Sequence, residues 1–406
     1  MKHFSYYNLL LNDSMYLNLP LTLYIHIPFC QHKCPYCDFR SEVMPVWPEA
    51  EYMAALQREL AWRCQQLADD RRPLHALFIG GGTPSLLAAE SVAALLDGVQ
   101  KRWQLAEGCE ITLEANPESA SLDKMRAWRQ MGINRLSLGV QAFDQARLSW
   151  LERPHDLATA RQAIRHAQQL DFTSVNVDLI YATPGHTEQQ WQQELAEAME
   201  WGVQHLSCYA LTVERGTPLH RRWQQQLWSP LDEEQESRLF CQTRTQLQQG
   251  GWHGYEISNF AREGHRCRHN CNYWAYGDYL GVGLAAHGKW MAADGSLLRS
   301  CNHGALSAYL AALADDTLPE QQHPFGQTQT LSPQEVGQEM ILLGLRYDGG
   351  VERRLYRQLT GSDLVEQQRA LLTLWQEAGW VEWNEQRVRL TEQGYLRTDA
   401  LISRLH

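Results

Sequence analysis

The chain has 406 residues, with 36 lysines and arginines against 47 aspartates and glutamates, which gives a formal net charge of −11. This length allows one large domain and one smaller domain. The acidic balance excludes a general binder of nucleic-acid phosphates, so no nucleic-acid partner is expected. No apolar run reaches the roughly 18 residues needed to span a membrane. The 10 cysteines, together with residues 1–18 that lack a signal-peptide pattern, predict a cytosolic protein whose thiols are buried or bind metal.

Strands and helices alternate from residue 21 onward, at intervals of about 30 to 35 residues, as βα units do. The six predicted strands are 21–27, 75–79, 110–115, 135–140, 174–180 and 205–212. The predicted helices between them lie at 49–67, from 85, at 156–170 and at 187–200. Six such units favour a partial (β/α)6 TIM-like barrel, with an open doubly wound sheet as the alternative. Residues 1–18 lack a clear period and are expected to be a poorly ordered extension, in which Met15 is a second candidate start.

The pattern changes after residue 212. A helix at 232–249 and a short strand at 254–260 complete the predicted barrel, delimited as 19–260. Residues 261–330 combine a loop rich in histidine, cysteine and aromatic residues with a linker. The tail, 331–406, shows amphipathic helices and then two alternating runs around Asn384-Glu385, which is a hairpin pattern. This order predicts a small winged-helix-like α+β domain. Without a strong basic stripe, it is expected to act as a lid or a protein contact and not to bind DNA.

Cys30, Cys34 and Cys37 lie in one tight loop just after the first predicted strand. A [4Fe–4S] cluster has four irons, and cysteine thiolate is its usual ligand. Three thiolates would hold three irons and leave the fourth open to a small molecule. Zinc sites usually combine ligand pairs from separate loops, and a disulfide framework is unexpected in a long chain without an export signal. A [4Fe–4S] cluster is therefore the favoured interpretation of the three cysteines, and a purely structural role is the alternative.

This Cys-x3-Cys-x2-Cys spacing, with Tyr36 before the third cysteine, resembles the signature of the radical S-adenosylmethionine (SAM) superfamily. In that superfamily the open iron binds the amino and carboxylate groups of SAM, and reduction cleaves SAM to a 5′-deoxyadenosyl radical. The run Tyr-Ile-His-Ile-Pro-Phe-Cys at 24–30 resembles more narrowly its coproporphyrinogen dehydrogenase-like branch. The resemblance implies a barrel of the radical SAM type, with the three cysteines as cluster ligands.

Glycine and polar residues stand at the ends of the predicted strands. Carboxyl ends of parallel strands carry ligands in both candidate folds, so these residues predict one shared site. Taken singly, each is more often a turn, cap or surface residue. The resemblance assigns matching residues to SAM binding. They are Tyr24, Tyr36, Gly81, Gly82, Thr83, Glu114, Gln141, Arg153, Asp178 and Thr212.

The segment 267–274 reads Cys-Arg-His-Asn-Cys-Asn-Tyr-Trp. Imidazole and thiolate are both axial ligands of heme iron, and tyrosine and tryptophan can stack on a flat macrocycle. A polar surface loop is an equally good interpretation of this segment by itself, and a metal site at Cys267, His269 and Cys271 is a third. The motif His-Asn-x-x-Tyr-Trp, and the motif Gly-x-Gly-x-x-Ala-His-Gly at 281–288, resemble heme chaperones of the HemW type. In that group the first histidine is implicated in heme binding, which implies His269, with His287 as a lesser candidate.

Phe39 stands where oxygen-independent coproporphyrinogen dehydrogenase has a fourth cysteine. The resemblance therefore implies a heme chaperone that binds heme and a SAM-coordinating [4Fe–4S] cluster and passes heme to acceptor hemoproteins. The expected acceptors are respiratory enzymes at the membrane, which this chain would meet peripherally at the inner face. The alternative is a radical SAM enzyme that acts on a porphyrin, either a coproporphyrinogen III dehydrogenase or a heme-modifying enzyme. A homodimer, covalent heme attachment and cleavage of SAM are left open.

Overall fold

The computed structural model describes residues 19–67, 70–315 and 323–405, so the extension predicted at 1–18 lies outside the described residues. Its main body is a 12-stranded sheet with the order β14-β13-β12-β11-β1-β4-β5-β6-β7-β8-β10-β9. Six consecutive strands of this sheet are parallel. They are β1 (Leu21–Ile27), β4 (Leu74–Gly81), β5 (Leu105–Ala115), β6 (Arg135–Gln141), β7 (Ser174–Tyr181) and β8 (His205–Ala210). Each corresponds to one of the six predicted strands.

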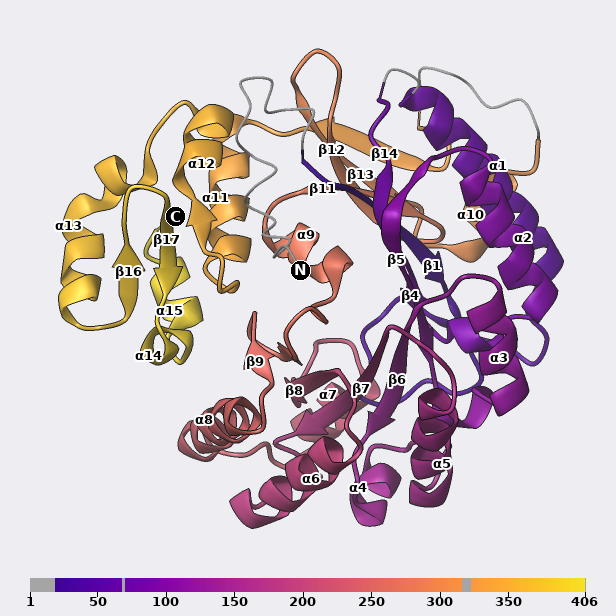
Figure 1. The fold of residues 1–406 in the computed structure, drawn as a ribbon, viewed down its shortest axis with the longest axis horizontal. Helices are drawn as coiled ribbons and strands as arrows, with labels where there is room; N and C mark the ends of the chain where they lie inside the picture. Colours follow the sequence, from indigo (N-terminus) through magenta and orange to yellow (C-terminus); the bar gives the residue numbers. More distant parts are fainter. Residues whose placement is uncertain (1–18, 68–69, 316–322, 406) are drawn as a thin grey trace.

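Helices cover the convex side of these strands, and the sheet curls around its other side (Figure 1). The connecting helices are α1 (Glu49–Gln66), α2 (Ala89–Gln100), α3 (Leu122–Gln130), α4 (Gln145–Trp150), α5 (Leu157–Gln168) and α6 (Glu188–Glu200). Two short 3-10 turns, η3 (Pro84–Leu86) and η4 (Pro117–Ser119), follow β4 and β5. This one-sided arrangement confirms the partial (β/α)6 barrel, because a doubly wound sheet would carry helices on both faces.

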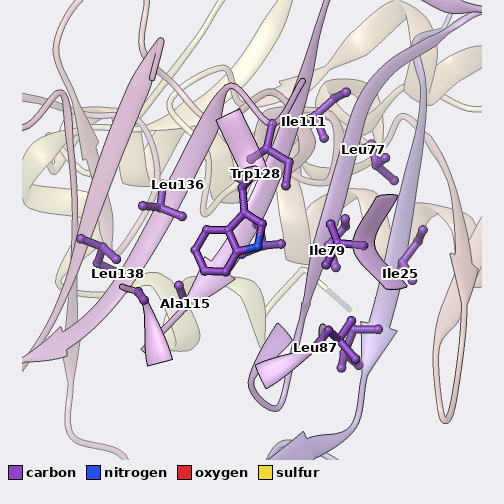
Figure 2. Packing of buried hydrophobic residues seen from close by; sticks show 14 of the residues in the cluster. Ile25, Leu77, Ile79, Leu87, Ile111, Ala115, Trp128, Leu136 and Leu138 are labelled. Atoms are coloured by element: carbon purple, nitrogen blue, oxygen red, sulfur yellow. The ribbon is translucent and has the colours of Figure 1, made fainter. Parts of the chain in front are cut away.

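The barrel strands alternate between apolar and polar side chains, and the two sets face opposite ways. On β6, for example, Leu136 and Leu138 are buried in the main hydrophobic cluster with helix residues such as Trp128 of α3. Figure 2 shows part of this layer around Trp128. The intervening residues, such as Arg135 and Ser137, line a cavity on the concave side. Burial of the apolar set therefore holds the barrel together from outside, and the inside stays polar and partly hollow.

The sheet continues beyond the six barrel strands at both edges. After α7 (Pro218–Gln224) and α8 (Glu233–Gln249), the short strands β9 (His253–Gly254) and β10 (Asn259–Ala261) pair antiparallel next to β8. At the other edge β11 (Asp278–Val282) pairs parallel with β1, and the hairpin strands β12 (His287–Met291), β13 (Leu297–Asn302) and β14 (Gly326–Thr330) follow it, with α10 (Leu306–Ala312) before β14. The region predicted as loop and linker thus supplies four strands of the main sheet.

A two-turn helix, α9 (Arg268–Trp274), occupies the segment expected to be a loop. Its Asn272 side chain donates hydrogen bonds to Thr22 Oγ1 (3.2 Å) and to the Asp278 carbonyl (2.8 Å), which fixes the helix against β1 and β11. The expectation of a loop was wrong because α9 faces a polar cavity. Its sequence therefore lacks the apolar period that identifies a surface helix.

The C-terminal domain is a separate small unit. It contains α11 (Pro333–Gly344), β15 (Val351–Glu352), α12 (Arg353–Thr360), α13 (Leu364–Glu377), β16 (Val381–Trp383), β17 (Arg387–Leu390), α14 (Glu392–Tyr395) and α15 (Thr398–Ile402). The predicted hairpin is confirmed, with Val381 opposite Leu390, and β15 adds a third strand that is too short to be seen in the sequence. This order confirms the winged-helix-like α+β domain. In Figure 1 it lies across the open side of the barrel.

Three arginines of the main body bind three carboxylates of the C-terminal domain. Arg244 on α8 pairs with Glu392 (2.6 Å), Arg266 pairs with Asp348 (2.7 Å), and Arg299 on β13 pairs with Glu339 on α11. Charge-assisted pairs with two parallel hydrogen bonds, such as these, fix orientation as well as distance. The domain is therefore attached to the barrel at both ends of the sheet. Within the described part of the chain, no helix is both long and apolar enough to cross a membrane.

Candidate cofactor site

The cysteine loop is docked on the carboxyl ends of β1 and β4. The two-residue strands β2 (Phe29–Cys30) and β3 (Glu42–Val43) pair with each other and close the loop at its base. The backbone N–H of Gly82 donates to the Ile27 carbonyl (2.8 Å), and that of Thr83 donates to the Phe29 carbonyl (2.8 Å). The Thr83 hydroxyl also lies 3.5 Å from Cys30 Sγ. The glycine-rich end of β4 is therefore part of the support of the cysteine loop.

Glycine is required in this support by both conformation and space. Gly81 has a φ of 118°, which side chains rarely adopt. A Cβ at Gly82 would lie 2.7 Å from the Phe29 carbonyl oxygen and 3.0 Å from Cys30 Sγ. Gly81 and Gly82 are therefore more than residues of a plain turn, because they also set how closely the cysteine loop approaches β4.

A cavity of about 360 Å³ opens beside the cysteine loop. Its lining includes all three cysteines and every residue predicted for SAM except Tyr24. These lining residues are Cys30, Cys34, Cys37, Tyr36, Gly81, Gly82, Thr83, Glu114, Gln141, Arg153, Asp178 and Thr212. The structure thus brings together, from six strand ends and their loops, residues that are far apart in the sequence.

The chemistry of the three thiols fits a group that carries its own positive charge. Burial raises the pKa of Cys30, and raises the pKa of Cys37 to about 11, so neither thiol ionises readily by itself. Metal binding requires the thiolate form and releases the proton. The Arg153 guanidinium lies 3.2 Å from Cys34 Sγ and is well placed to stabilise a thiolate there. Among the described residues no three His, Cys, Asp or Glu side chains converge on a single metal ion. Three thiols in one loop suit a cluster, in which each thiolate binds a different iron.

Arg153 is held in place by two further acceptors. Its Nη2 donates to Asn116 Oδ1 (2.8 Å) and to the Gly139 carbonyl (3.0 Å). Its Nε is buried and has no hydrogen-bond partner among the described residues. Because Arg153 lines the cavity, its guanidinium offers a positive charge to an anionic group of a ligand there.

Two half-buried carboxyl groups, Glu114 and Asp178, form the inner wall of this cavity. The Gly81 N–H donates to Glu114 Oε2 (2.9 Å), and burial raises the pKa of Glu114 to about 8. Asp178 accepts hydrogen bonds from Ser137 Oγ (3.2 Å) and Asn176 Nδ2 (2.8 Å), and burial raises its pKa as well. With a pKa of about 8, the Glu114 carboxyl can donate or accept hydrogen bonds near neutral pH, as hydroxyl and amino groups of a ligand require.

A second cavity, of about 540 Å³, lies deeper in the barrel and shares part of its wall with the first. The shared residues are Phe39, Gly81, Glu114, Ser137, Asp178 and Tyr209. Tyr24, which the resemblance assigns to SAM, lines this second cavity. Tyr273 and Trp274 of α9 also reach it, and so does Arg346, just after α11. The C-terminal domain therefore forms part of the enclosure.

His269 of α9 lines the second cavity. Its ring stacks on Tyr24, with centroids 6.0 Å apart and an interplanar angle of 20°, and lies 5.3 Å from the ring of Phe78. Nδ1 lies 3.1 Å from Thr22 Oγ1. Burial lowers the pKa of His269 to about 4, so the imidazole is neutral, which is the form that ligates metal ions. His287, the lesser candidate, is exposed and lies 3.5 Å from Cys301 Sγ on the neighbouring strand.

The sequence prediction missed the polar residues in the middle of the barrel strands. Asn176, His205 and Ser207 line the second cavity and are joined by hydrogen bonds, with His205 Nδ1 2.6 Å and Ser207 Oγ 3.2 Å from Asn176 Oδ1. The signal that could have found them is the strict alternation of polar and apolar residues along β7 and β8. A strand of a parallel sheet is usually apolar on both faces, so this alternation indicates a polar interior.

Comparison with known proteins identifies the class to which the chain belongs. The model of the radical SAM superfamily matches residues 24–198, and the model of the HemN C-terminal domain matches residues 331–397. Among solved structures, coproporphyrinogen III oxidase (HemN) from Escherichia coli superposes with a TM-score of 0.79 at 23% sequence identity, over 96% of this chain and 91% of that chain. The two share a fold. Fold and cysteine loop together define a radical SAM protein, a class whose cofactors are a [4Fe–4S] cluster and SAM.

Relatives narrow the class further. The chain is 38% identical over 288 residues to the heme chaperone HemW of Haemophilus influenzae, and 39% identical over 284 residues to that of Escherichia coli, in each case over 69% of this chain and 73% of the relative. It is 32% identical over 375 residues to the heme chaperone HemW of Bacillus subtilis, over 92% of this chain and 96% of the relative. The chain belongs to the HemW family of heme chaperones.

Proposed function

We propose that the chain is a heme chaperone that binds heme and a SAM-coordinating [4Fe–4S] cluster and delivers heme to acceptor hemoproteins. The observation that carries this proposal is the shared wall of the two cavities. The cysteine loop lines one cavity, His269 lines the other, and Glu114, Gly81 and Asp178 border both. The names of the relatives, heme chaperones in three bacteria, support the same function.

In this proposal each cavity has its own ligand. Cys30, Cys34 and Cys37 would hold the cluster, which supplies an iron open to SAM and a centre that can accept an electron. The Arg153 guanidinium would bind the carboxylate of SAM, and Glu114 and Asp178 would bind its hydroxyl and amino groups. Tyr36, Gly81, Gly82, Thr83, Gln141 and Thr212 would complete that pocket.

The second cavity would hold heme against His269. Its neutral imidazole is fixed by the stacked Tyr24 ring, which limits its rotation, and Tyr273 and Trp274 offer aromatic surface. The barrel wall and the C-terminal domain would shield the macrocycle from water until an acceptor binds. The proposed acceptors are respiratory enzymes at the membrane, which this chain would meet peripherally as a cytosolic protein. A mass measurement in solution would show whether the chain forms a dimer.

The rival function is a radical SAM enzyme that oxidises a porphyrin. Phe39, at the position of the fourth cysteine in oxygen-independent coproporphyrinogen dehydrogenase, lines both cavities and is 61% exposed. An apolar ring at this place gives no further thiolate to the site. The proposal therefore favours heme delivery over coproporphyrinogen oxidation.

The test is a set of three anaerobic experiments on the reconstituted full chain. Titration with hemin, followed by its visible absorbance, should give saturable binding that His269→Ala weakens by about tenfold or more, since changes around a metal ligand alone cost that much. Cys34→Ser should lose the cluster absorbance and keep the fold, while Cys241→Ser, at an exposed position on α8, should lose neither. Incubation with reductant, SAM and coproporphyrinogen III should give no protoporphyrinogen. Turnover in that assay, or an unchanged hemin affinity in His269→Ala, would contradict the proposal.

A further inference from the structure

His26, on β1, connects the end of the cysteine loop to Tyr24. Its Nε2 lies 2.7 Å from the Arg40 carbonyl oxygen, and its Nδ1 lies 2.9 Å from Tyr24 Oη. Because a carbonyl can only accept, Nε2 carries the proton and donates it to Arg40. Nδ1 is then the acceptor for the Tyr24 hydroxyl. The His26 side chain is 7% exposed, so these hydrogen bonds do not compete with bulk water.

Tyr24 extends this connection to the proposed heme ligand. Its ring stacks on the His269 ring with centroids 6.0 Å apart, and it also stacks on Phe78 at 6.1 Å. Three successive contacts therefore lead from the Arg40 carbonyl, through the rings of His26 and Tyr24, to the imidazole of His269. His26 is buried, and the half-buried rings of Tyr24 and His269 contact each other and Phe78, so a shift of one ring displaces the next.

The connection also reaches the SAM cavity, through the contact between His26 and Gly81. Gly81 lines that cavity, and a Cβ on Gly81 would lie 2.5 Å from Cε1 and Nδ1 of His26. The glycine backbone thus rests directly on the His26 ring, and its N–H is bonded to Glu114. The backbone of His26 itself is fixed, because Tyr52 Oη donates to its carbonyl (2.8 Å). A ligand that fixes the position of the Gly81 backbone would therefore restrict the orientation of the His26 ring, while the backbone of β1 stays in place.

We propose that His26 and Tyr24 are positioning residues that couple the SAM cavity to His269, so that bound SAM strengthens heme binding. The physical reason is preorganisation. SAM fixes Gly81 and the cysteine loop, His26 is then held in one orientation, and Tyr24 presents His269 in the position that heme requires. By linkage, heme strengthens SAM binding by the same factor. This inference rests on the proposed function.

The test measures hemin affinity of the reconstituted full chain with and without saturating SAM, from the visible absorbance of bound hemin. For the unmodified chain, SAM should lower the hemin Kd by about fivefold or more, the lower end of ordinary coupling between two sites. Tyr24→Phe keeps the ring on His269 and removes the hydroxyl that binds His26. In this variant the effect of SAM should fall to less than about twofold.

Two further variants separate coupling from a merely structural role. Tyr279→Phe removes a hydroxyl from another ring that contacts His269, at 6.5 Å, and should keep the full effect of SAM. His26→Gln retains an amide N–H that can reach the Arg40 carbonyl, so it should keep its iron content and lose the effect of SAM. A structural role alone would change hemin affinity equally in both states and leave their ratio unchanged.

The outcomes distinguish this inference from the proposed function. If SAM does not change the hemin Kd of the unmodified chain, or if Tyr24→Phe retains the full effect, the coupling is wrong and the chaperone assignment is untouched. If His269→Ala leaves hemin affinity unchanged, the proposed heme ligand is wrong, whatever the ratio in the other variants.

Discussion

At the scale of single residues, the site depends on polar groups that are buried but not neutralised by an opposite charge. Glu114 is the clearest case. It borders both cavities, accepts one hydrogen bond from Gly81, and has the negative Asp178 nearby, which raises its pKa further. The pKa of about 8 is well above the 4.5 of an ordinary glutamate. Such a group adapts its protonation to its ligand, and it destabilises the folded chain when the site is empty.

The first residue-scale prediction concerns stability and pH. Because the folded pKa of Glu114 lies above the unfolded one, the folded chain holds a proton that the unfolded chain releases between 4.5 and about 8. Stability therefore falls as pH rises through that range, and it is fully present only below 4.5. Glu114→Gln, which cannot ionise, should lose this part of the pH dependence. Urea unfolding of the cofactor-free chain at about pH 5.5 and about pH 7.5 measures the effect. An identical fall in both proteins would show that Glu114 is not the group that titrates.

At the scale of elements, the site is made by where strands end and by what the following turns exclude. The end of β4 is the clearest example, since Gly82 leaves room for the Phe29 carbonyl and for Cys30 Sγ. The strand alternation places Glu114, Ser137 and Asp178 on the concave face of three neighbouring strands. The elements thus determine which side chains meet, and the glycines determine how closely they do so.

Gly82→Ala gives the element-scale prediction. The new Cβ would lie 2.7 Å from the Phe29 carbonyl oxygen, so the cysteine loop must move away from β4. Cluster content after reconstitution should fall by roughly tenfold, because changes in the support of a metal site cost about that much in metal affinity. The circular dichroism of the barrel should not change. Gly304→Ala is the matched control, because nothing lies within 4 Å of a Cβ there. Full iron content in Gly82→Ala would mean that the loop has another way to hold the cluster.

The sequence predicted the positions of the strands better than it predicted which residues line the interior of the barrel. The first strand was predicted with the bounds of β1, Leu21–Ile27, because an apolar run followed by proline fixes both its type and its end. The helix α9 was missed because it packs on polar groups and on Thr22 of a distant strand, a contact that no local pattern contains. Tyr24 was grouped with the SAM residues by its motif, whereas its side chain turns into the second cavity. Cysteine spacing identified the chemistry, and only the tertiary structure showed that two cavities share a wall.

At the scale of the whole molecule, the C-terminal domain is fixed across the open side of the barrel by paired charges. Arg299 of β13 and the hydroxyl of Tyr276 both donate to Glu339 on α11, the latter over 2.8 Å. Pairs of this kind are partly shielded from water and weaken with salt. An apolar cluster also joins the two parts, because Tyr276, Met291 and Leu297 of the main body pack with residues of the C-terminal domain. The charge pairs therefore share the attachment of the domain with apolar packing.

Glu339→Gln gives the whole-molecule prediction. Removing the charge while keeping the shape should weaken the bond to Arg299, at a cost of about 1–3 kcal/mol. Faster amide exchange in α11 and β13, with the barrel strands unchanged, is the expected result, and high salt should produce the same pattern in the unmodified chain. Glu377→Gln, at an exposed position on α13, is the control. Exchange that stays unchanged in α11 would show that apolar packing alone holds the domain.

The position of β1 has a consequence for how the site responds to change. This strand, which leads into the cysteine loop, is paired on one side with β4 and on the other with β11, in the middle of the largest sheet. Both edges of β1 are thus occupied by backbone pairing, and a slip of one residue would turn its apolar face away from the core. A substitution in the cysteine loop is therefore accommodated within the loop itself, while the strand that carries it keeps its register.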